Sequence, residues 1–467
     1  MSSIPIRDRL ARLFHYARGE GLGPFMIRAV TGSGVLQIGG MAVSFLVGVQ
    51  LARGLGLAGY GLYGLAIAVV TLASVPGEFG LPKLVMREVA AAAVRKDFPS
   101  LLGVIGWANR VSLGLSVLAA VFIACAAVLF RHRLEPGLVV ALLWGIPVIP
   151  LVAVGKIEGA ALQGLHNVVL GQAGIYFLRP LFFSACLALL FWLAPKAGPG
   201  GAMALNAITA ALALILTAYW LKSRLPKPGR RTSVVQGRAW LSATVPMALT
   251  DGMRILQAQL GVVMMGVLNS PSEVGLFRIA ASTATMIAIP IALITSVTNA
   301  LLASLHAEGD TVRLQKLNTH SAWAMTIGVL ALALPLFLAG RFLLIFFFGG
   351  EYGPAATALD ILCFGQLISA AFGLNSTLLD MTGHERRTTR AMIIGLVVNV
   401  VALAALAPRW GNVGAAWATT LSLLVWNVLT WVDAWKLVGI DTSVLPRPAG
   451  GADRGRRTDP FGPGAVE

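Results

Sequence analysis

Three arginines lie inside long apolar runs of the sequence, where a charge is costly. Arg179 falls near the middle of one run, Arg254 lies at similar depth in a second, and Arg278 lies about one turn inside a third. A charge at bilayer depth costs roughly 2.5–3.5 kcal/mol on insertion scales, so these side chains are expected to face protein or water. Guanidinium groups offer forked donors that match phosphate oxygens. We therefore predict that the three arginines bind a phosphate-bearing group.

Asp251 is the candidate for ion coupling, because a buried carboxylate can exchange a proton or a cation against the charge of a substrate. Its helix is predicted to carry four notable residues on one face, Asp251, Arg254, Gln257 and Gly261. Two structural interpretations stay open here. Asp251 and Arg254 would neutralise each other inside a packed bundle, and Arg278 would snorkel to the outer surface.

The composition identifies the class of protein. The chain has 467 residues, is 57% hydrophobic and 12% charged, and has a mean hydropathy of +0.79. This is typical of a polytopic membrane protein. A net charge of +16 would suggest nucleic acid in a soluble chain, but cytoplasmic loops of membrane proteins concentrate Lys and Arg. No nucleic-acid partner is therefore expected.

Hydropathy predicts an all-α membrane protein with about twelve transmembrane helices. The predicted spans are 30–51, 60–79, 111–130, 138–162, 169–193, 202–221, 241–268, 274–302, 323–339, 355–379, 391–406 and 413–438. The predicted domains are a cytosolic N-terminal arm (1–28), a six-helix lobe (29–222), a basic cytosolic linker (223–239), a second six-helix lobe (240–441) and a disordered cytosolic tail (442–467). The loops assigned to the outer face hold only roughly six of the 36 Lys and Arg, so both termini are expected in the cytosol.

The two halves share features at a nearly constant offset. Gly61 and Gly275 each open a span and lie 214 positions apart, as do Pro76 and Pro290 deeper in the same two spans. Further pairs at similar offsets are Gly201 with Gly414 and Gly164 with Gly383. Six spans per half return the chain to its starting side, so the repeats are predicted to be parallel. Their axis would run along the membrane normal, with a central cavity between the lobes.

Catalytic arrangements are missing from the sequence. It has no Ser/His/Asp set, no clustered His and Cys, no acidic pair and no P-loop, and the predicted outer connections are short. We therefore expect no catalytic residue, metal site or cofactor. A transporter is favoured over an enzyme.

Several motifs follow one another along most of the chain. They are LARGLGLAGYGLYGLA at 51–66, EFGLPKLVMREVA at 78–90, ALQGLHN at 161–167, FLRPL at 177–181, GGEYGPAATALDIL at 349–362 and GNVGAAWATTLS at 411–422. Their order and spacing resemble the polysaccharide-transporter branch of the multidrug/oligosaccharidyl-lipid/polysaccharide superfamily. This branch contains the O-antigen and exopolysaccharide repeat-unit flippases. The resemblance extends over about 30–438.

The resemblance implies a flippase of the cytoplasmic (inner) membrane. Its substrate would be a polyprenyl, and more narrowly undecaprenyl, pyrophosphate that carries a sugar repeat unit. A wet, cationic cavity would shelter the head while the tail stays in lipid, and the lobes would rock in alternating access. A polysaccharide polymerase and a chain-length regulator are the protein partners that such a role implies.

Four other functions fit the sequence less well. A cation-coupled multidrug exporter of the same superfamily favours an acidic cavity, whereas the mid-span charges here are mostly arginine. A peptidoglycan lipid precursor flippase usually carries two further spans. A membrane enzyme that transfers or polymerises glycans needs a large outer loop, and a structural scaffold gives the mid-membrane charges no purpose.

Overall fold

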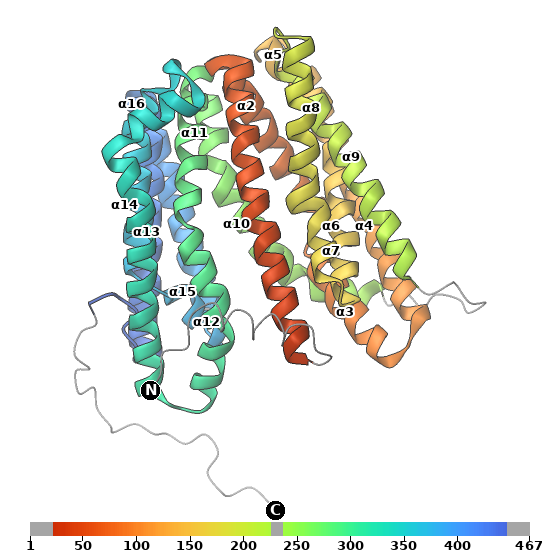
Figure 1. Ribbon diagram of the computed structural model, residues 1–467, viewed down its shortest axis with the longest axis vertical. Coiled ribbons are helices and arrows are strands. Elements are labelled where there is room, and N and C mark those ends of the chain that lie inside the picture. The colour runs from red at the N-terminus through yellow and green to blue at the C-terminus, as the bar shows by residue number, and fades with distance from the viewer. Residues whose placement is uncertain (1–21, 226–236, 446–467) are drawn as a thin grey trace, which may run out of the picture. The chain divides into compact units, whose positions relative to one another are not determined.

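A computed structural model describes residues 22–225 and 237–445, and every regular element in these ranges is helical (Figure 1). The elements are α2 (Leu22–Glu78), α3 (Leu81–Arg95), α4 (Phe98–Leu129), α5 (Pro136–Gly145), α6 (Val148–Gly164), α7 (Val168–Ala173), the π-helix η1 (Gly174–Leu178), α8 (Arg179–Leu193), α9 (Pro199–Arg224), α10 (Gly237–Leu268), α11 (Pro271–Ile287), α12 (Ile289–Ala307), α13 (Thr311–Phe348), the 3₁₀-helix η2 (Gly350–Tyr352), α14 (Ala355–Ala371), α15 (Asn375–Met381) and α16 (Glu385–Val438). The predicted all-α class is confirmed.

The number of spans agrees with the prediction. Seven helices in the described ranges are long and apolar enough to cross a bilayer, or nine when the bent pairs α11–α12 and α14–α15 each count as one span. Two of the seven contain the longest helices, α2 and α16, which have 57 and 54 residues. Each is about 80 Å long, against a hydrocarbon core of about 30 Å. Each is divided by a left-handed glycine, Gly56 (φ 68°) and Gly411 (φ 55°). Division at these two glycines turns the nine spans into eleven, and α10, a helix of 32 residues that is not among the nine, gives twelve segments in the described ranges.

The predicted spans leave 80–110 as a connection, yet α3 occupies the first part of it. Gly80 begins α3 in the left-handed conformation (φ 67°). A β carbon there would lie 2.9 Å from the backbone of α10 at Thr244 and Ala248, so only glycine allows this approach. The eighth and tenth predicted spans are bent, by 41° between α11 and α12 and by 44° between α14 and α15.

The predicted polar segments lie largely outside the described residues. Within the arm predicted at 1–28, α2 already begins at Leu22, and nothing is described before it. Most of the linker predicted at 223–239 and most of the tail predicted at 442–467 also fall outside the two described ranges. The roles of these segments stay predictions.

Contacts between residues divide the chain into two compact units. Unit 1 contains the chain up to Met286 together with Pro335–Cys363 and Leu396–Ser422. Unit 2 contains Ile287–Leu334, Phe364–Gly395 and the chain from Leu423 onward. The lobe boundaries derived from the sequence stay a prediction. The candidate site described below lies within unit 1.

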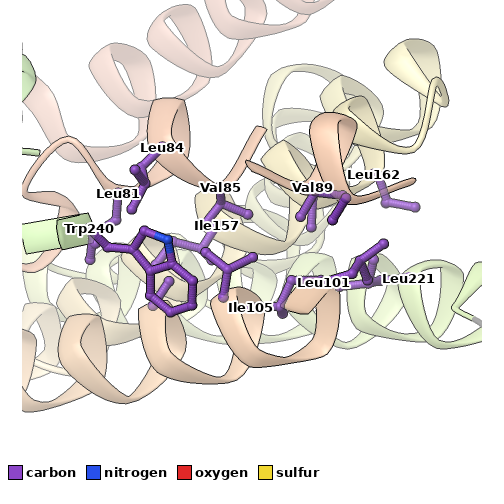
Figure 2. Packing of buried hydrophobic residues seen from close by; sticks show 14 residues of the cluster. Leu81, Leu84, Val85, Val89, Leu101, Ile105, Ile157, Leu162, Leu221 and Trp240 are labelled. Atoms are coloured by element: carbon purple, nitrogen blue, oxygen red, sulfur yellow. The ribbon is translucent and has the colours of Figure 1, made fainter. Parts of the chain in front are cut away.

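A buried apolar cluster holds α3 against its neighbours in unit 1 (Figure 2). Leu81, Leu84, Val85 and Val89 recur on one face of α3, at the spacing of an amphipathic helix. They pack with residues of α4, α6, α9 and α10, namely Leu101, Ile105, Ile157, Leu162, Leu221 and Trp240. The Trp240 ring also lies 5.3 Å from that of Trp107. The start of α10 is thereby fixed to the helices that precede it.

A set of hydrogen bonds, which we call the Gly56 clasp, joins the turn at Gly56 to the η2 turn in unit 1. The bonds run from Arg53 to the carbonyls of Phe346 and Phe347, from the Tyr352 hydroxyl to the carbonyl of Ala52 (3.0 Å), and from the Leu57 amide to the Glu351 carboxylate (3.3 Å). Arg53 thus satisfies carbonyls at the end of α13, which have no partner within the helix. Two of the motifs that carry the family resemblance are therefore in direct contact.

Within unit 2, side chains bind backbone groups near the end of α16. Asp441 exchanges two hydrogen bonds with Gln315 of α13, and its carboxylate accepts one from Trp431 (2.8 Å). Deeper in the unit, the Asn375 amide donates to Asn427 (3.1 Å). Interhelical bonds of this kind are a usual means of holding membrane helices together.

Equivalent positions of the two predicted repeats meet where α2 crosses α11, both within unit 1. A β carbon at Gly61 would overlap the carbonyl of Pro271, and one at Gly275 would lie 2.6 Å from the carbonyl of Leu57. Leu57 and Pro271 are 214 positions apart, as are Gly61 and Gly275. Gly61 therefore lies against Pro271, while its equivalent Gly275 lies against Leu57, which is the equivalent of Pro271. A two-fold axis produces this reciprocal pattern. This supports the predicted duplication.

Candidate functional site

The local helix geometry places Arg179 at a π-helical turn. Pro180 follows Arg179 and has no amide hydrogen, so the carbonyl of Tyr176 loses its partner four residues on. The chain responds with the π-helix η1, which ends directly before Arg179, and the Arg179 amide donates to Gly174 five residues back. The carbonyl of Tyr176 lies against Gly40 of α2, where a β carbon would overlap it. Such π turns are frequent at functional sites.

The Arg179 side chain points into unit 1 and begins a chain of hydrogen bonds. Its guanidinium donates to Oδ1 of Asn206 on α9 at 2.8 Å, and Nδ2 of Asn206 donates to the hydroxyl of Tyr63 on α2 at 2.7 Å. Tyr63 is buried, with 3% of its surface exposed, and stacks on Phe183 at 6.5 Å. Arg179 thus has a polar partner, Asn206, inside the protein, as is expected for a charge within an apolar span.

Arg278 also turns inward, onto α2. Its Nη1 donates to the carbonyl of Gly64 at 3.1 Å, and its side chain fills the space that a β carbon at Gly64 would need. The two residues are 214 positions apart and so occupy equivalent places in the two repeats. The interpretation in which Arg278 snorkels to the surface does not match this inward conformation.

Arg278 lines a cavity of about 280 Å³ in unit 1. The polar residues around it are Ser44, Tyr60, Tyr63, Arg278, Ser282 and Thr285. A second cavity of about 200 Å³ is lined by Arg179, Asn206 and their neighbours. Both cavities include Ser44, Val47 and Tyr63 in their walls, so they adjoin at Tyr63. Among the described residues that line them there is no carboxylate, and the two arginines make this region cationic.

Arg254 and Asp251 lie elsewhere. Arg254 is exposed on α10 and lines neither of the two cavities. Asp251 forms its ion pair with Lys83 of α3, at 2.7 Å, rather than with Arg254. The structure therefore brings Arg179 and Arg278 close to one residue, Tyr63, and does not bring Arg254 to it. The substrate-binding and ion-coupling roles of these residues stay predictions.

A second ion pair lies inside the helices of unit 1. Lys156 of α6 contacts the carboxylate of Glu78, which also accepts a hydrogen bond from Ser74 (3.2 Å). The Glu78 side chain is only 13% exposed and that of Lys156 is 32% exposed. Lys156 therefore has a structural partner within unit 1.

Sequence reasoning did not select Tyr63, Asn206 or Gly64 as site residues. Tyr63 and Gly64 lie close to Gly61, and Asn206 lies close to Gly201, two of the glycines that mark the predicted repeat. A usable signal exists for Asn206, since an amide side chain within an apolar span needs a hydrogen-bonding partner. For Gly64 the signal is its alignment with Arg278 in the repeat.

Solved structures share this fold. A multidrug resistance MATE family transporter of the MOP superfamily in an inward-facing conformation matches with a TM-score of 0.69 at 14% identity, and the match covers 88% of this chain and 98% of that one. The lipid II flippase MurJ in an inward closed conformation matches with a TM-score of 0.66 at 12% identity, over 87% of each chain. A MOP superfamily transporter from Pyrococcus furiosus matches with a TM-score of 0.62 at 15% identity, over 91% of this chain and 97% of that one. These proteins are similar in fold, which supports the predicted all-α, polytopic membrane architecture.

The family is shown by sequence. Comparison with curated proteins gives no significant match. The model of the family described as polysaccharide biosynthesis protein, in contrast, matches residues 28–302, more than half of the chain. The chain therefore belongs to the polysaccharide biosynthesis protein family, as the resemblance of its motifs predicts.

Proposed function

We propose that this protein is a flippase for lipid-linked oligosaccharides. It moves polyprenyl-pyrophosphate-linked repeat units across the cytoplasmic membrane for the synthesis of O-antigen, capsule or exopolysaccharide. The observation that carries the proposal is the pair of arginines, Arg179 and Arg278, on the two sides of Tyr63 in adjoining cavities without a lining carboxylate. Membership of the polysaccharide biosynthesis family supports the class of substrate.

The physical task is to move a charged, hydrated head through hydrocarbon. A pyrophosphate cannot enter lipid unaided, and buried guanidinium groups without an acidic partner attract it strongly because the surroundings screen poorly. The polyprenyl tail is apolar and stays in the bilayer. Alternating access of the two lobes then carries the head from one face to the other, and Arg254 serves as a third contact during that movement.

A multidrug exporter of organic cations is the main alternative within the superfamily. The lining of the two cavities argues against it, because Arg278 and Arg179 would repel a cationic drug and the described lining residues offer no carboxylate. The protein partners of the proposed flippase are a polysaccharide polymerase and a chain-length regulator.

Replacing Arg278 by alanine tests the proposal. The protein is reconstituted into liposomes with a polyprenyl diphosphate oligosaccharide whose sugar head carries a fluorescent label. Flipping is measured as the loss of fluorescence when labelled heads reach the outer leaflet and meet a quencher that stays outside the liposomes. Arg278→Ala is expected to reduce the rate at least about tenfold, since charge-assisted bonds to phosphate are worth about 1.5–3 kcal/mol. Arg278→Lys retains the charge but lacks the forked donors of a guanidinium. Its flipping rate is expected to lie between those of wild type and Arg278→Ala.

The matched control is Arg110→Ala. Arg110 is exposed on α4, and its side chain donates to the carbonyl of Gly106, one turn back. The Arg110→Ala variant should flip the labelled lipid at the wild-type rate. Wild-type flipping by Arg278→Ala would overturn the proposal, because the cationic cavity would then contribute nothing to transport.

Asp251 is proposed as the coupling carboxylate, and the Lys83 pair permits a clean test. The two side chains are 51% and 35% exposed, so the pair is worth about 0–1 kcal/mol. Asp251→Asn is expected to leave folding nearly unchanged and to abolish the dependence of flipping on an imposed proton or sodium gradient. Lys83→Met breaks the same ion pair but keeps the carboxylate, and should retain that dependence. Equal gradient dependence in wild type and Asp251→Asn would exclude Asp251 as the coupling group.

A further inference from the structure

The direction of each hydrogen bond between Arg179, Asn206 and Tyr63 is fixed by chemistry. A guanidinium can only donate, so the Asn206 atom that faces Arg179 must be the amide oxygen. The amide nitrogen of Asn206 then faces Tyr63 and donates to it. The assignment of oxygen and nitrogen in this amide therefore needs no assumption beyond the charge of Arg179.

A donor is left over at the end of this chain. The Tyr63 oxygen accepts from Asn206, and its own hydrogen remains to be donated. The described residues show no acceptor for it. Tyr63 lines the cavity that Arg278 lines, and the hydroxyls of Ser282 and Thr285 in that wall donate to carbonyls of their own helix. The donors available to that cavity thus include the Tyr63 hydroxyl and the guanidinium of Arg278, which uses one of its five N–H groups on Gly64.

We propose that Tyr63 and Arg278 together hold a phosphate oxygen of the substrate, and that Asn206 and Arg179 are positioning residues that aim the Tyr63 hydroxyl at it. This inference rests on the proposed function and assigns different roles to two arginines that the sequence treats alike. Arg278 is the direct contact. Arg179 acts through Asn206, and its charge keeps the amide turned so that Tyr63 donates into the cavity.

The arrangement selects for a deprotonated phosphate group. An anionic oxygen accepts from both the hydroxyl and the guanidinium, whereas a neutral alcohol accepts more weakly and a cation cannot accept at all. A diphosphate offers one phosphate to this pair and leaves the second for other contacts. We therefore expect a diphosphate and a monophosphate lipid both to depend on Tyr63, with the neutral alcohol binding poorly.

The test measures binding to the full-length protein in lipid nanodiscs. The probes are farnesyl diphosphate, farnesyl monophosphate and farnesol, with binding followed by isothermal titration calorimetry. Tyr63→Phe removes only the hydroxyl and should weaken diphosphate binding about tenfold or more, since a hydrogen bond to a charged group is lost. Arg278→Lys should weaken diphosphate binding more than Arg179→Lys, because Arg278 contacts the phosphate directly and a lysine at position 179 still provides a donor for Asn206.

Asn206→Asp is the decisive variant for the positioning role. A carboxylate still accepts from Arg179, but it also accepts from Tyr63 and so takes the hydrogen away from the cavity. Its added charge would weaken anion binding for a second reason, and the double variant with Tyr63→Phe separates the two causes. If Asn206 acts through Tyr63, the double variant loses less binding than the sum of the two single losses, and its remaining loss beyond that of Tyr63→Phe measures the added charge. If Asn206→Asp fails to fold, Asn206→Ala replaces it in the same cycle.

The outcomes separate this inference from the proposed function. Wild-type binding by Tyr63→Phe, together with weak binding by Arg278→Ala, would overturn the role of Tyr63 and leave the flippase site standing. Additive losses in the double variant would overturn the positioning role of Asn206. Wild-type binding by Arg278→Ala would remove the site itself.

Discussion

Replacing Gly61 by alanine is expected to destabilise the protein by about 3 kcal/mol or more. The added methyl group would overlap the carbonyl of Pro271 where α2 crosses α11. The obstacle is backbone, so no side chain can rotate away and the helices have to separate. The separation would also disturb the bond between Gly64 and Arg278 one turn further on. The measurement is the thermal unfolding midpoint of the detergent-purified protein, followed by size-exclusion chromatography after heating.

Gly34→Ala is the matched control. Gly34 lies in the same helix, and a β carbon there would meet nothing within 4 Å. Because alanine favours the helix over glycine by about 1 kcal/mol, this variant should be as stable as wild type or slightly more stable. Equal unfolding midpoints for Gly61→Ala and Gly34→Ala would show that the close crossing is not required.

Replacing Glu78 by glutamine should cost about 3–5 kcal/mol, because it leaves the ammonium group of Lys156 among apolar helices without a counter-charge. Glu78 also accepts from Ser74, so two bonds lose their charged acceptor. The comparison is with Asp251→Asn, which breaks an ion pair of similar length but much greater exposure. The unfolding midpoint should fall far more for Glu78→Gln than for Asp251→Asn.

A second substitution checks the cause of this loss. Lys156→Met removes the unpaired charge, so the double variant Glu78→Gln, Lys156→Met should recover most of the lost stability. If the double variant is no more stable than Glu78→Gln, then the loss comes from packing around Glu78 and not from the isolated charge.

The membrane class and the number of spans follow from the sequence because hydrocarbon thickness fixes the length of an apolar helix. The boundaries of the individual helices are harder to predict from the sequence. α3 carries charged residues such as Lys83 and Arg87 and is too polar to register as a span, although its apolar residues recur at helical spacing. Bends within spans depend on how neighbouring helices pack, which hydropathy does not record.

The site was only partly predictable for a related reason. Position within an apolar span singled out Arg179, Arg254 and Arg278, because a charge there needs a partner in protein or water, and the structure brings only Arg179 and Arg278 to the cavities at Tyr63. The partners themselves are remote in sequence: Asn206 and Tyr63 are 143 positions apart, and Lys83 and Asp251 are 168 apart. Helix periodicity places Arg254 beside Asp251 on one face, whereas the cation that pairs with Asp251 is Lys83 of α3.

The Gly56 clasp has a consequence for how this part of the chain tolerates change. Three of its acceptors are main-chain oxygens, those of Phe346, Phe347 and Ala52. Every amino acid supplies that oxygen, so point replacements at these three positions preserve the bonding. One inserted residue in the same helices would turn the oxygen by about 100° around the axis and lose it. At these three acceptor positions the clasp therefore constrains spacing rather than residue identity, whereas Arg53, Tyr352 and Glu351 contribute through their side chains.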